Sequence, residues 1–263
     1  AGVARAAAAT AAGLALTWSM LPRHVPRSAP IQGQVAVHGP TNTGVFRTGV
    51  GERAVINLPD GSVATLDTDS EMRVAYSQNA RAIYLVSGQA LFEVAHGRPQ
   101  PFQVFAKGQR ITAVGTVFNV RIEGAAVRVS MVDGAVRLNE QVQPGAVAAR
   151  RATDLILTAG EAALAAPDRA PVVETAPDVR DVTSWRGGGL VFNDTPLIDA
   201  IAEINRYTRR PIAIADPSVG AYRVSGVFKS NDPEHFAQAM TEVLPIELIR
   251  AADGAPMLKA RKD

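Results

Sequence analysis

The stretch from residue 58 to residue 94 decides the fold. It begins Leu58-Pro59-Asp60-Gly61-Ser62 and ends Leu85-Val86-Ser87-Gly88-Gln89-Ala90-Leu91-Phe92-Glu93-Val94. Residues 53–58 and 62–66 flank Pro59-Asp60-Gly61, which is a strong hairpin signal because glycine tolerates a positive φ in a tight turn. Residues 81–86 and 89–94 flank Ser87-Gly88 in the same way. This stretch therefore predicts short strands joined by tight hairpins.

More strand patterns follow at intervals of about 8 to 12 residues, the spacing typical of an all-β sandwich or barrel. Breaks fall near Gly108, Gly115 and Asp133-Gly134, and the patterns between them cover residues 101–106, 109–114, 117–122, 126–132 and 135–138. Val127, Val129 and Met131 alternate with polar residues, so one face of their strand should be buried. Residues 45–160 are predicted to form an all-β domain of the sandwich or jelly-roll-like kind.

The last third of the chain has a different rhythm. Residues 161–184 contain Pro167, Pro171 and Pro177, which predicts an extended connector with little packed structure. Residues 185–263 are predicted to form a small α+β lobe in which a βαβ unit occurs twice. Its strands are expected at 190–192, 211–215, 222–228, 246–249 and 257–259.

Two helices are predicted in this lobe. The first should begin with Thr195 as its N-cap and Pro196 at its first helical position, and the second should begin at Asn231-Asp232-Pro233. The expected fold class is mainly β, an all-β domain followed by the α+β lobe.

Residues 6–22 carry no charge and are rich in alanine. Three interpretations compete: a membrane span that begins before residue 1, the apolar part of a signal peptide, and an alanine-rich soluble helix. We favour a membrane segment over residues 1–22. Residues 23–44 are rich in proline, glycine and serine and predict a linker.

Composition excludes several classes of function. The formal net charge is only +2 and the basic residues are dispersed, so nucleic-acid binding is not expected. Without cysteine, thiolate catalysis and cysteine zinc sites are impossible. The four histidines lie far apart in the sequence. Asp67 to Glu71 is similar to the start of a calcium loop, but Met72 stands where that loop needs glycine. No metal or cofactor is expected.

Gly115-Thr116 is the one pair that suggests chemistry. A threonine hydroxyl can attack the preceding glycine carbonyl if the turn is strained, which gives an ester that water then opens. The alternative is a β-bulge at Gly115 followed by an ordinary strand residue at Thr116, and chemistry alone favours that alternative.

Long ordered motifs resemble those of FecR-type transmembrane anti-sigma regulators. In the β domain these are the stretch from Leu58 to Val94, then Pro101-Phe102, Gly115-Thr116 with Phe118 and Val120, Gly134 and Gly160-Glu161. The last lobe resembles the short N-terminal domain of secretins and TonB-dependent transducers, on the strength of Trp185, Gly188, Leu190, Phe192, Pro196-Leu197, Glu203, Arg206-Tyr207, Asp216-Pro217, Ser225-Gly226 and Phe228.

The resemblance implies a single-span inner-membrane protein with most of this chain in the periplasm. Such a protein binds the signalling domain of an outer-membrane TonB-dependent transducer, often one that imports ferric siderophores, and relays the signal to an extracytoplasmic-function sigma factor. The relay uses a cytoplasmic sigma-binding domain that residues 1–263 do not include. Some members cleave themselves between the matching glycine and threonine, which strengthens the hypothesis at Gly115-Thr116. No other enzymatic activity is expected.

The partner is expected to bind by adding a strand to an exposed sheet edge. The candidate edge comprises Tyr222, Arg223, Val224 and Ser225, where polar and apolar residues alternate. The alternative is that this segment is a central strand of its own lobe. A structural envelope module, which would assemble into rings, is a further possible function.

Overall fold

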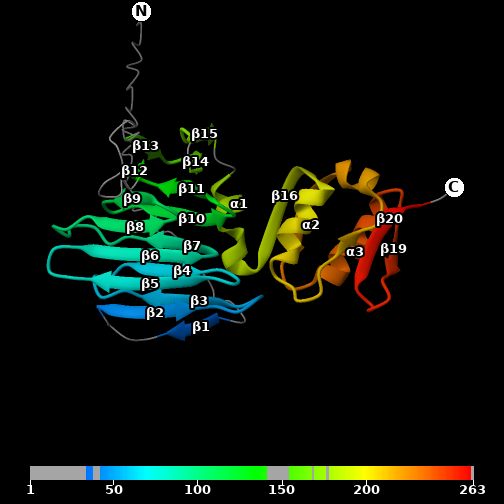
Figure 1. Ribbon diagram of the computed structural model, residues 1–263, viewed down its shortest axis with the longest axis horizontal. Helices are drawn as coiled ribbons and strands as arrows, with labels where there is room; N and C mark the ends of the chain where they lie inside the picture. The colour runs from blue at the N-terminus through cyan, green and yellow to red at the C-terminus, as the bar shows by residue number, and fades with distance from the viewer. Residues whose placement is uncertain (1–33, 38–41, 141–153, 168, 176–177, 262–263) are drawn as a thin grey trace, which may run out of the picture.

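The computed structural model describes residues 34–37, 42–140, 154–167, 169–175 and 178–261. Over these residues the chain forms a large β-sandwich and a smaller α+β lobe that lie side by side (Figure 1). The expected fold class is confirmed.

The sandwich consists of two sheets. The first has the strand order β1-β3-β4-β7-β10-β11-β14-β15. Its strands are β1 (Gln34–Val37), β3 (Arg53–Asn57), β4 (Val63–Leu66), β7 (Gln89–Glu93), β10 (Val117–Glu123), β11 (Ala126–Asp133), β14 (Glu161–Ala165) and β15 (Val172–Thr175). Neighbouring strands are antiparallel except for the parallel pair β1 and β3.

The second sheet has the order β13-β12-β9-β8-β6-β5-β2. Its strands are β2 (Thr43–Arg47), β5 (Glu71–Tyr76), β6 (Arg81–Ser87), β8 (Phe102–Ala106), β9 (Gln109–Ala113), β12 (Ala135–Glu140) and β13 (Leu155–Thr158). Here β6 and β8 form the parallel pair. Strand β1 lies within residues 23–44, which were expected to be a linker.

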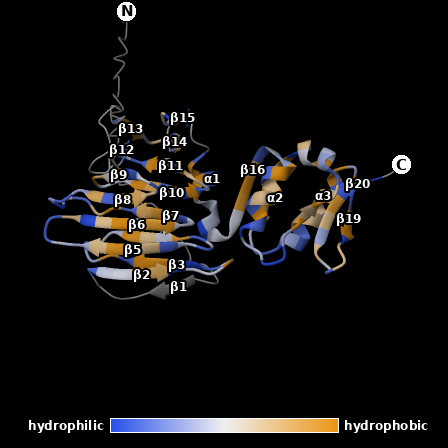
Figure 2. Ribbon diagram, in the orientation of Figure 1, coloured by the Kyte–Doolittle hydropathy of each residue, from blue (hydrophilic) through white to orange (hydrophobic). Residues whose placement is uncertain are grey.

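One apolar core fills the space between the two sheets. Phe92 on the first sheet packs against Phe102 on the second, with ring centroids 5.7 Å apart, and against Phe118 beside it, at 5.3 Å. All three side chains are fully buried. Figure 2 shows hydrophobic and hydrophilic residues alternating along the strands, as expected when one face of each strand meets the core.

Glycines mark the corners where the chain passes from one sheet to the other. Gly88, Gly115 and Gly134 have φ values of +79°, +65° and +78° and connect β6 to β7, β9 to β10 and β11 to β12. The hairpins predicted at Ser87-Gly88 and Asp133-Gly134 are therefore wrong, because the flanking strands belong to different sheets. The hairpins predicted at Gly61 and at Asp253-Gly254 are confirmed, and the break near Gly108 is also a hairpin, between β8 and β9.

The turn at Asp60 is held by a buried polar cluster. Arg81 donates from Nη1 to Asp60 Oδ2 at 2.6 Å, and the Ser62 hydroxyl donates to the same oxygen at 2.7 Å. Tyr76 donates its hydroxyl to Asp60 Oδ1 at 3.2 Å, and Arg98 donates to the Asp60 carbonyl at 2.7 Å. Asp60 thus ties the β3–β4 turn to β5, β6 and the β7–β8 loop.

Residues 161–184 differ from the expected connector. Residues 161–165 form β14, which pairs with β11 and buries Ala162, Ala163 and Ala165. Small alanine side chains fit in β14 because this strand packs against the core of the sandwich. Past β15 come the short helix α1 (Val179–Thr183) and the 3-10 turn η1 (Ser184–Gly187), which carries the buried Trp185.

The α+β lobe contains two small sheets and two helices. The first sheet pairs β16 (Gly189–Pro196) with β18 (Arg223–Lys229). The second has the order β17 (Ala213–Ile214), β20 (Pro256–Ala260), β19 (Ile246–Arg250). The helices are α2 (Leu197–Asn205) and α3 (Pro233–Val243), and the 3-10 turn η2 covers Pro217–Ala221. The βαβ order is as predicted.

Helix α2 begins one residue later than expected. Thr195 was predicted as its N-cap, but Thr195 pairs with Val224 in the sheet, so its backbone is extended and Pro196 becomes the N-cap. Helix α3 begins as predicted: Asp232 caps it by accepting from the His235 N–H at 3.1 Å, and Pro233 is the first helical residue.

Within the described part of the chain, no helix combines the length and the apolar character needed to cross a membrane. The segment 6–22 lies outside the described residues.

Candidate functional site at the junction of the lobes

The α+β lobe is anchored on the outer face of the first sheet of the sandwich. Leu91 points away from the sandwich core and belongs to the apolar cluster of the other lobe, together with Trp185 and Leu190. Val117 and Val132 pack against the same cluster. At one side of this contact Arg186 forms an ion pair with Glu93 at 2.9 Å. The two lobes therefore share one apolar core at their junction.

Asp67 is the centre of a buried polar cluster at this junction. It follows β4, and its side chain has no exposed surface. Its Oδ2 accepts a hydrogen bond of 2.6 Å from the Tyr207 hydroxyl and lies 3.4 Å from Arg206 Nη2. Its Oδ1 lies 3.4 Å from Arg53 Nε. A carboxylate of the sandwich is thus bound by two residues of the other lobe.

Arg206 and Arg53 extend this cluster in opposite directions. Arg206 also donates to Gln89 Oε1 at 3.0 Å and to Glu203 Oε1 at 2.6 Å. Arg53 donates to the Ser230 hydroxyl at 2.5 Å, and its guanidinium lies 5.4 Å from the centre of the Tyr207 ring. Both arginines therefore contact both lobes. We call Asp67, Arg53, Arg206 and Tyr207 the junction cluster.

Backbone contacts fix the same interface. The Thr68 hydroxyl donates to the Arg206 carbonyl at 3.0 Å and accepts from the Gly51 N–H at 2.8 Å. A Cβ on Gly51 would lie only 3.1 Å from the Tyr207 carbonyl, so a side chain there would press on the other lobe. The loop after α2 therefore fits closely against the sandwich.

Burial governs the charges of the junction cluster. Burial raises the pKa of Asp67, against the opposing effects of the Arg206 charge and the Tyr207 hydrogen bond. Burial also raises the pKa of Tyr207, and the Asp67 charge raises it further, so the phenol keeps its proton. Such a cluster stabilises the docked arrangement only while every member is in place.

The predicted pair Gly115-Thr116 lies at a sheet corner away from the junction cluster. Gly115 has a left-handed φ, and a Cβ built on it would lie 2.0 Å from the His96 ring, so that ring packs directly on the glycine. Thr116 is 3% exposed, and its hydroxyl has no hydrogen-bond partner among the described residues. The pair therefore combines a left-handed glycine with a buried hydroxyl that has no partner among the described residues.

The predicted partner edge, Tyr222 to Ser225, begins one residue before β18, and among the described strands β18 is bonded to β16 alone. Arg223 and Ser225 are exposed, Val224 is 4% exposed, and Tyr222 packs against the lobe core. The exposed pair contacts Asp194: Arg223 donates to its carbonyl at 2.8 Å, and the Ser225 hydroxyl accepts from its N–H at 2.9 Å. The strand extends beyond these residues to Lys229.

The ladder shows which backbone groups of this two-stranded sheet point outward. Ser230 N–H donates to the Gly188 carbonyl at 2.9 Å, and Leu197 N–H donates to the Tyr222 carbonyl at 2.7 Å. Because bonding alternates along an antiparallel ladder, these two bonds fix its phase. The outward N–H and C=O groups on β18 are those of Arg223, Ser225, Val227 and Lys229, and on β16 those of Gly189 and Val191. Val227 is 72% exposed.

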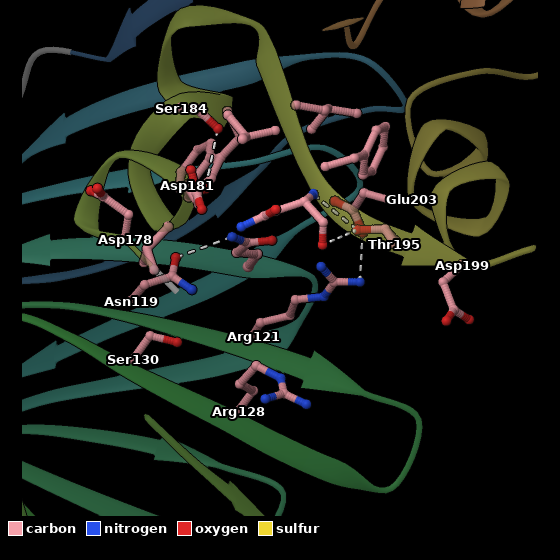
Figure 3. A pocket seen from close by; sticks show the side chains of 17 residues that line it. Asn119, Arg121, Arg128, Ser130, Asp178, Asp181, Ser184, Thr195, Asp199 and Glu203 are labelled. Atoms are coloured by element: carbon pink, nitrogen blue, oxygen red, sulfur yellow. Dashed lines mark hydrogen bonds and ion pairs between the residues drawn. The ribbon is translucent and has the colours of Figure 1, made fainter. Parts of the chain in front are cut away.

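A groove of about 670 Å³ lies between the lobes beside the junction cluster (Figure 3). Its floor is the outer face of the first sheet, with Asn119, Arg121, Arg128 and Ser130. Helix α1 and the turn η1 form one wall, with Asp178, Asp181, Ser184 and Trp185. Strand β16 and helix α2 form the other, with Thr195, Asp199 and Glu203. The structure contains no group of three or more potential metal ligands among the residues it describes.

Sequence reasoning did not identify the junction cluster. Asp67 was considered only as part of an incomplete calcium loop, and Arg206-Tyr207 only as a family motif. Asp67 and Arg206 are separated by 139 residues, and no local pattern pairs them. The local sequence held no signal for it, because aspartate is itself a common turn residue after a strand.

Comparison with known proteins agrees with this architecture. The family described as FecR protein matches residues 44–137. Two crystal structures of a candidate anti-sigma factor from Parabacteroides distasonis, at 2.50 and 1.65 Å resolution, are similar to the chain with a TM-score of 0.67 each. They are 22% and 23% identical to it, and the matches cover 84% and 83% of this chain and 100% of each of theirs. At that identity they show a shared fold. No curated protein sequence matches the chain.

The fold and the junction cluster define a two-lobed module in which a small α+β lobe is fixed on the outer face of a β-sandwich. The sandwich contains the matched residues 44–137, from β2 to β12. Residues 44–137 therefore form a FecR domain, and the expected resemblance is confirmed over this part of the chain.

Proposed function

We propose that this chain is the signal-receiving part of a transmembrane anti-sigma regulator. In this function the α+β lobe binds the signalling domain of an outer-membrane TonB-dependent transducer, as in regulation of siderophore-dependent iron uptake, and the sandwich transmits the event across the inner membrane toward a sigma factor. Support comes from the FecR domain and from the similar fold of the P. distasonis anti-sigma candidate.

The single observation that favours reception by the α+β lobe is the open edge of β18. Four outward N–H and C=O pairs, from Arg223 to Lys229, offer main-chain bonding to an added strand, and the exposed Val227 offers apolar contact. Addition of a strand needs no deep pocket, so the edge suits a partner domain with an edge of its own.

The junction cluster offers a route from that lobe toward the N-terminal part of the chain. Arg53 contacts Ser230 and Tyr207 of the α+β lobe, and it lies on β3. Strand β3 pairs in parallel with β1, where Gln34 is the partner of Arg53. A displacement of the α+β lobe would therefore act on β1, the first strand after the proposed membrane segment in the sequence.

A proline substitution on the edge tests this function. Val227→Pro should weaken binding of a transducer signalling domain by about tenfold or more, because proline removes an outward donor and adds bulk at the edge. The internal ladder does not use that N–H, so the fold should persist. Isothermal titration of the full chain against a panel of signalling domains from the source organism measures the effect.

Val191→Pro is the matched control, since it removes the corresponding outward N–H from β16. It should leave transducer binding within about twofold. Binding that survives Val227→Pro, or the absence of binding by every domain in the panel, would contradict the proposal.

A second candidate function is self-cleavage at Gly115-Thr116, favoured by the unpaired buried hydroxyl and the left-handed glycine. The Thr116 hydroxyl oxygen would attack the Gly115 carbonyl carbon, the peptide C–N bond would break, and the hydroxyl proton would end on the freed Thr116 amine. Water would then hydrolyse the ester, leaving a carboxylate on Gly115 and a free amine on Thr116. One molecule turns over once.

Mass spectrometry of the purified chain tests this candidate. Cleavage should yield fragments ending at Gly115 and beginning at Thr116, the second 148 residues long if the chain ends at residue 263. Thr116→Ser should retain cleavage, because the nucleophile remains, and Thr116→Ala should abolish it. Cleavage in Thr116→Ala, or an intact wild-type chain after prolonged incubation, would reject the mechanism.

A further inference from the structure

The groove between the lobes has a feature that the proposed function does not use: one wall is an open strand edge. Strand β16 is bonded to β18 on one side only, and its Val191 backbone points away from β18 into the groove that Val191 helps to line. In the described part of the chain, no strand or loop bonds to the Val191 N–H or C=O. The backbone N–H and C=O of Val191 are therefore available to an added strand inside the groove.

The shape of the groove suits an extended chain. Five consecutive or near-consecutive residues of β16 line it, namely Leu190, Val191, Phe192, Asn193 and Thr195. Its volume of about 670 Å³ lies within the range of binding pockets. Figure 3 shows the wall from α1 and η1 on one side of β16 and the floor strands below it, so an added strand would be enclosed on two sides.

The charge of the groove selects a basic ligand. Two arginines and four carboxylates line it, a net charge of −2 in a chain whose formal charge is +2. The arginines are already paired: Arg121 with Glu203 at 2.8 Å, and Arg128 with Glu174 at 2.6 Å. Asp178, Asp181 and Asp199 form no ion pair among the described residues.

Two further observations concern the wall formed by α1 and η1. Burial raises the pKa of Asp181, and the neighbouring Asp178 charge raises it further, against the opposing effect of the Arg180 charge. Trp185 is 4% exposed, and its indole N–H has no acceptor among the described residues. A bound cation would relieve the repulsion between the two aspartates.

We propose that this groove binds an extended peptide segment of a partner protein, with its backbone paired to β16 at Val191 and a lysine or arginine side chain beside Asp178 and Asp181. The site is distinct from the β18 edge and does not rest on the transducer proposal. The peptide adds a third strand to a two-stranded sheet, and the unpaired carboxylates set its charge preference.

Selection from a phage library of random dodecapeptides against the full chain tests this inference. Enriched peptides should contain lysine or arginine among alternating apolar residues. Labelled copies of these peptides should bind in fluorescence anisotropy, and replacing their basic residue by glutamate should weaken binding by about tenfold. Binding should also weaken as salt is raised.

Three variants locate the site. Val191→Pro should abolish peptide binding, and Asp178→Asn with Asp181→Asn should weaken it by about tenfold; asparagine at 178 keeps the cap of α1 while removing the charge. Asp253→Asn, on the distant β19–β20 turn, is the control that should change nothing. Since Val191→Pro could disturb the fold, the double asparagine variant provides an independent test.

The inference is overturned if no peptide is enriched, if enriched peptides are not basic, or if they bind the Val191→Pro and double asparagine variants as well as the wild type. Free spermine competing as strongly as the peptide would also overturn it, since it would show that the groove recognises a cation and not a strand. Val227→Pro should leave peptide binding intact, so failure of this inference and of the transducer proposal are distinguishable.

Discussion

Asp67→Ala is expected to lower the free energy of unfolding by about 3–5 kcal/mol, the cost of removing one member of a buried ion pair. The substitution leaves Arg53 buried without its carboxylate and Tyr207 without its acceptor at 2.6 Å. Because these residues come from both lobes, the α+β lobe should also unfold separately, so that chemical denaturation shows two transitions in place of one.

A double-mutant cycle isolates the contribution of the junction. Asp67→Ala and Tyr207→Phe combined should destabilise the protein less than the sum of the two single changes, since each removes the same hydrogen bond. Glu247→Ala is the control: its ion pair with Lys259 is exposed and should matter by less than about 1 kcal/mol. Additive effects of Asp67→Ala and Tyr207→Phe would contradict the junction cluster.

Asp60→Ala is expected to destabilise the sandwich by a similar amount, about 3–5 kcal/mol, because Arg81 would remain buried beside Tyr76 with no carboxylate. Arg81→Met should cost about as much, since it leaves Asp60 buried and charged. Urea denaturation at neutral pH measures both, and Glu247→Ala again serves as the exposed control. A loss below about 1 kcal/mol in both variants would contradict the buried cluster.

The same residue sets a pH dependence. Burial alone would raise the pKa of Asp60, but hydrogen bonds from Ser62 and Arg81 outweigh it and hold the pKa below the ordinary value of 3.8. A carboxyl whose folded-state pKa is lowered contributes stability above pH 3.8, and that stability is lost as the pH falls through the folded-state pKa. Asp60→Asn should therefore flatten the stability curve below pH 3.8, and an unchanged slope would contradict the assignment.

The positions of the turns could be predicted from the sequence because a turn that needs a positive φ favours glycine at that one residue. Gly61 and Gly254 turn strands back within one sheet, as expected. Gly88 also has a positive φ, but it leads the chain into the other sheet. A Cβ on Gly88 would lie 2.6 Å from the Ser70 backbone. A dipeptide shows that a turn exists, but the sheet that the next strand joins depends on long-range packing.

The junction cluster could not be predicted, because it too depends on long-range packing. Asp67, Arg53, Arg206 and Tyr207 are each ordinary in their local sequence, and their function arises only when the lobes dock. The segment 161–184 was predicted to be an open connector because of its prolines, but residues 161–165 precede all three prolines and form β14, which buries Ala162 and Ala163. Gly115-Thr116 could be singled out because its chemistry involves two adjacent residues.

Reception of the partner by the β18 edge is the central claim, and hydrogen–deuterium exchange tests it most directly. The full chain is compared with and without a bound transducer signalling domain. The amides of Arg223, Ser225, Val227 and Lys229 should become protected, because a paired strand covers them, while amides in β8 and β9 on the far sheet keep their rates. Protection confined to the β-sandwich, with β18 unchanged, would contradict the account.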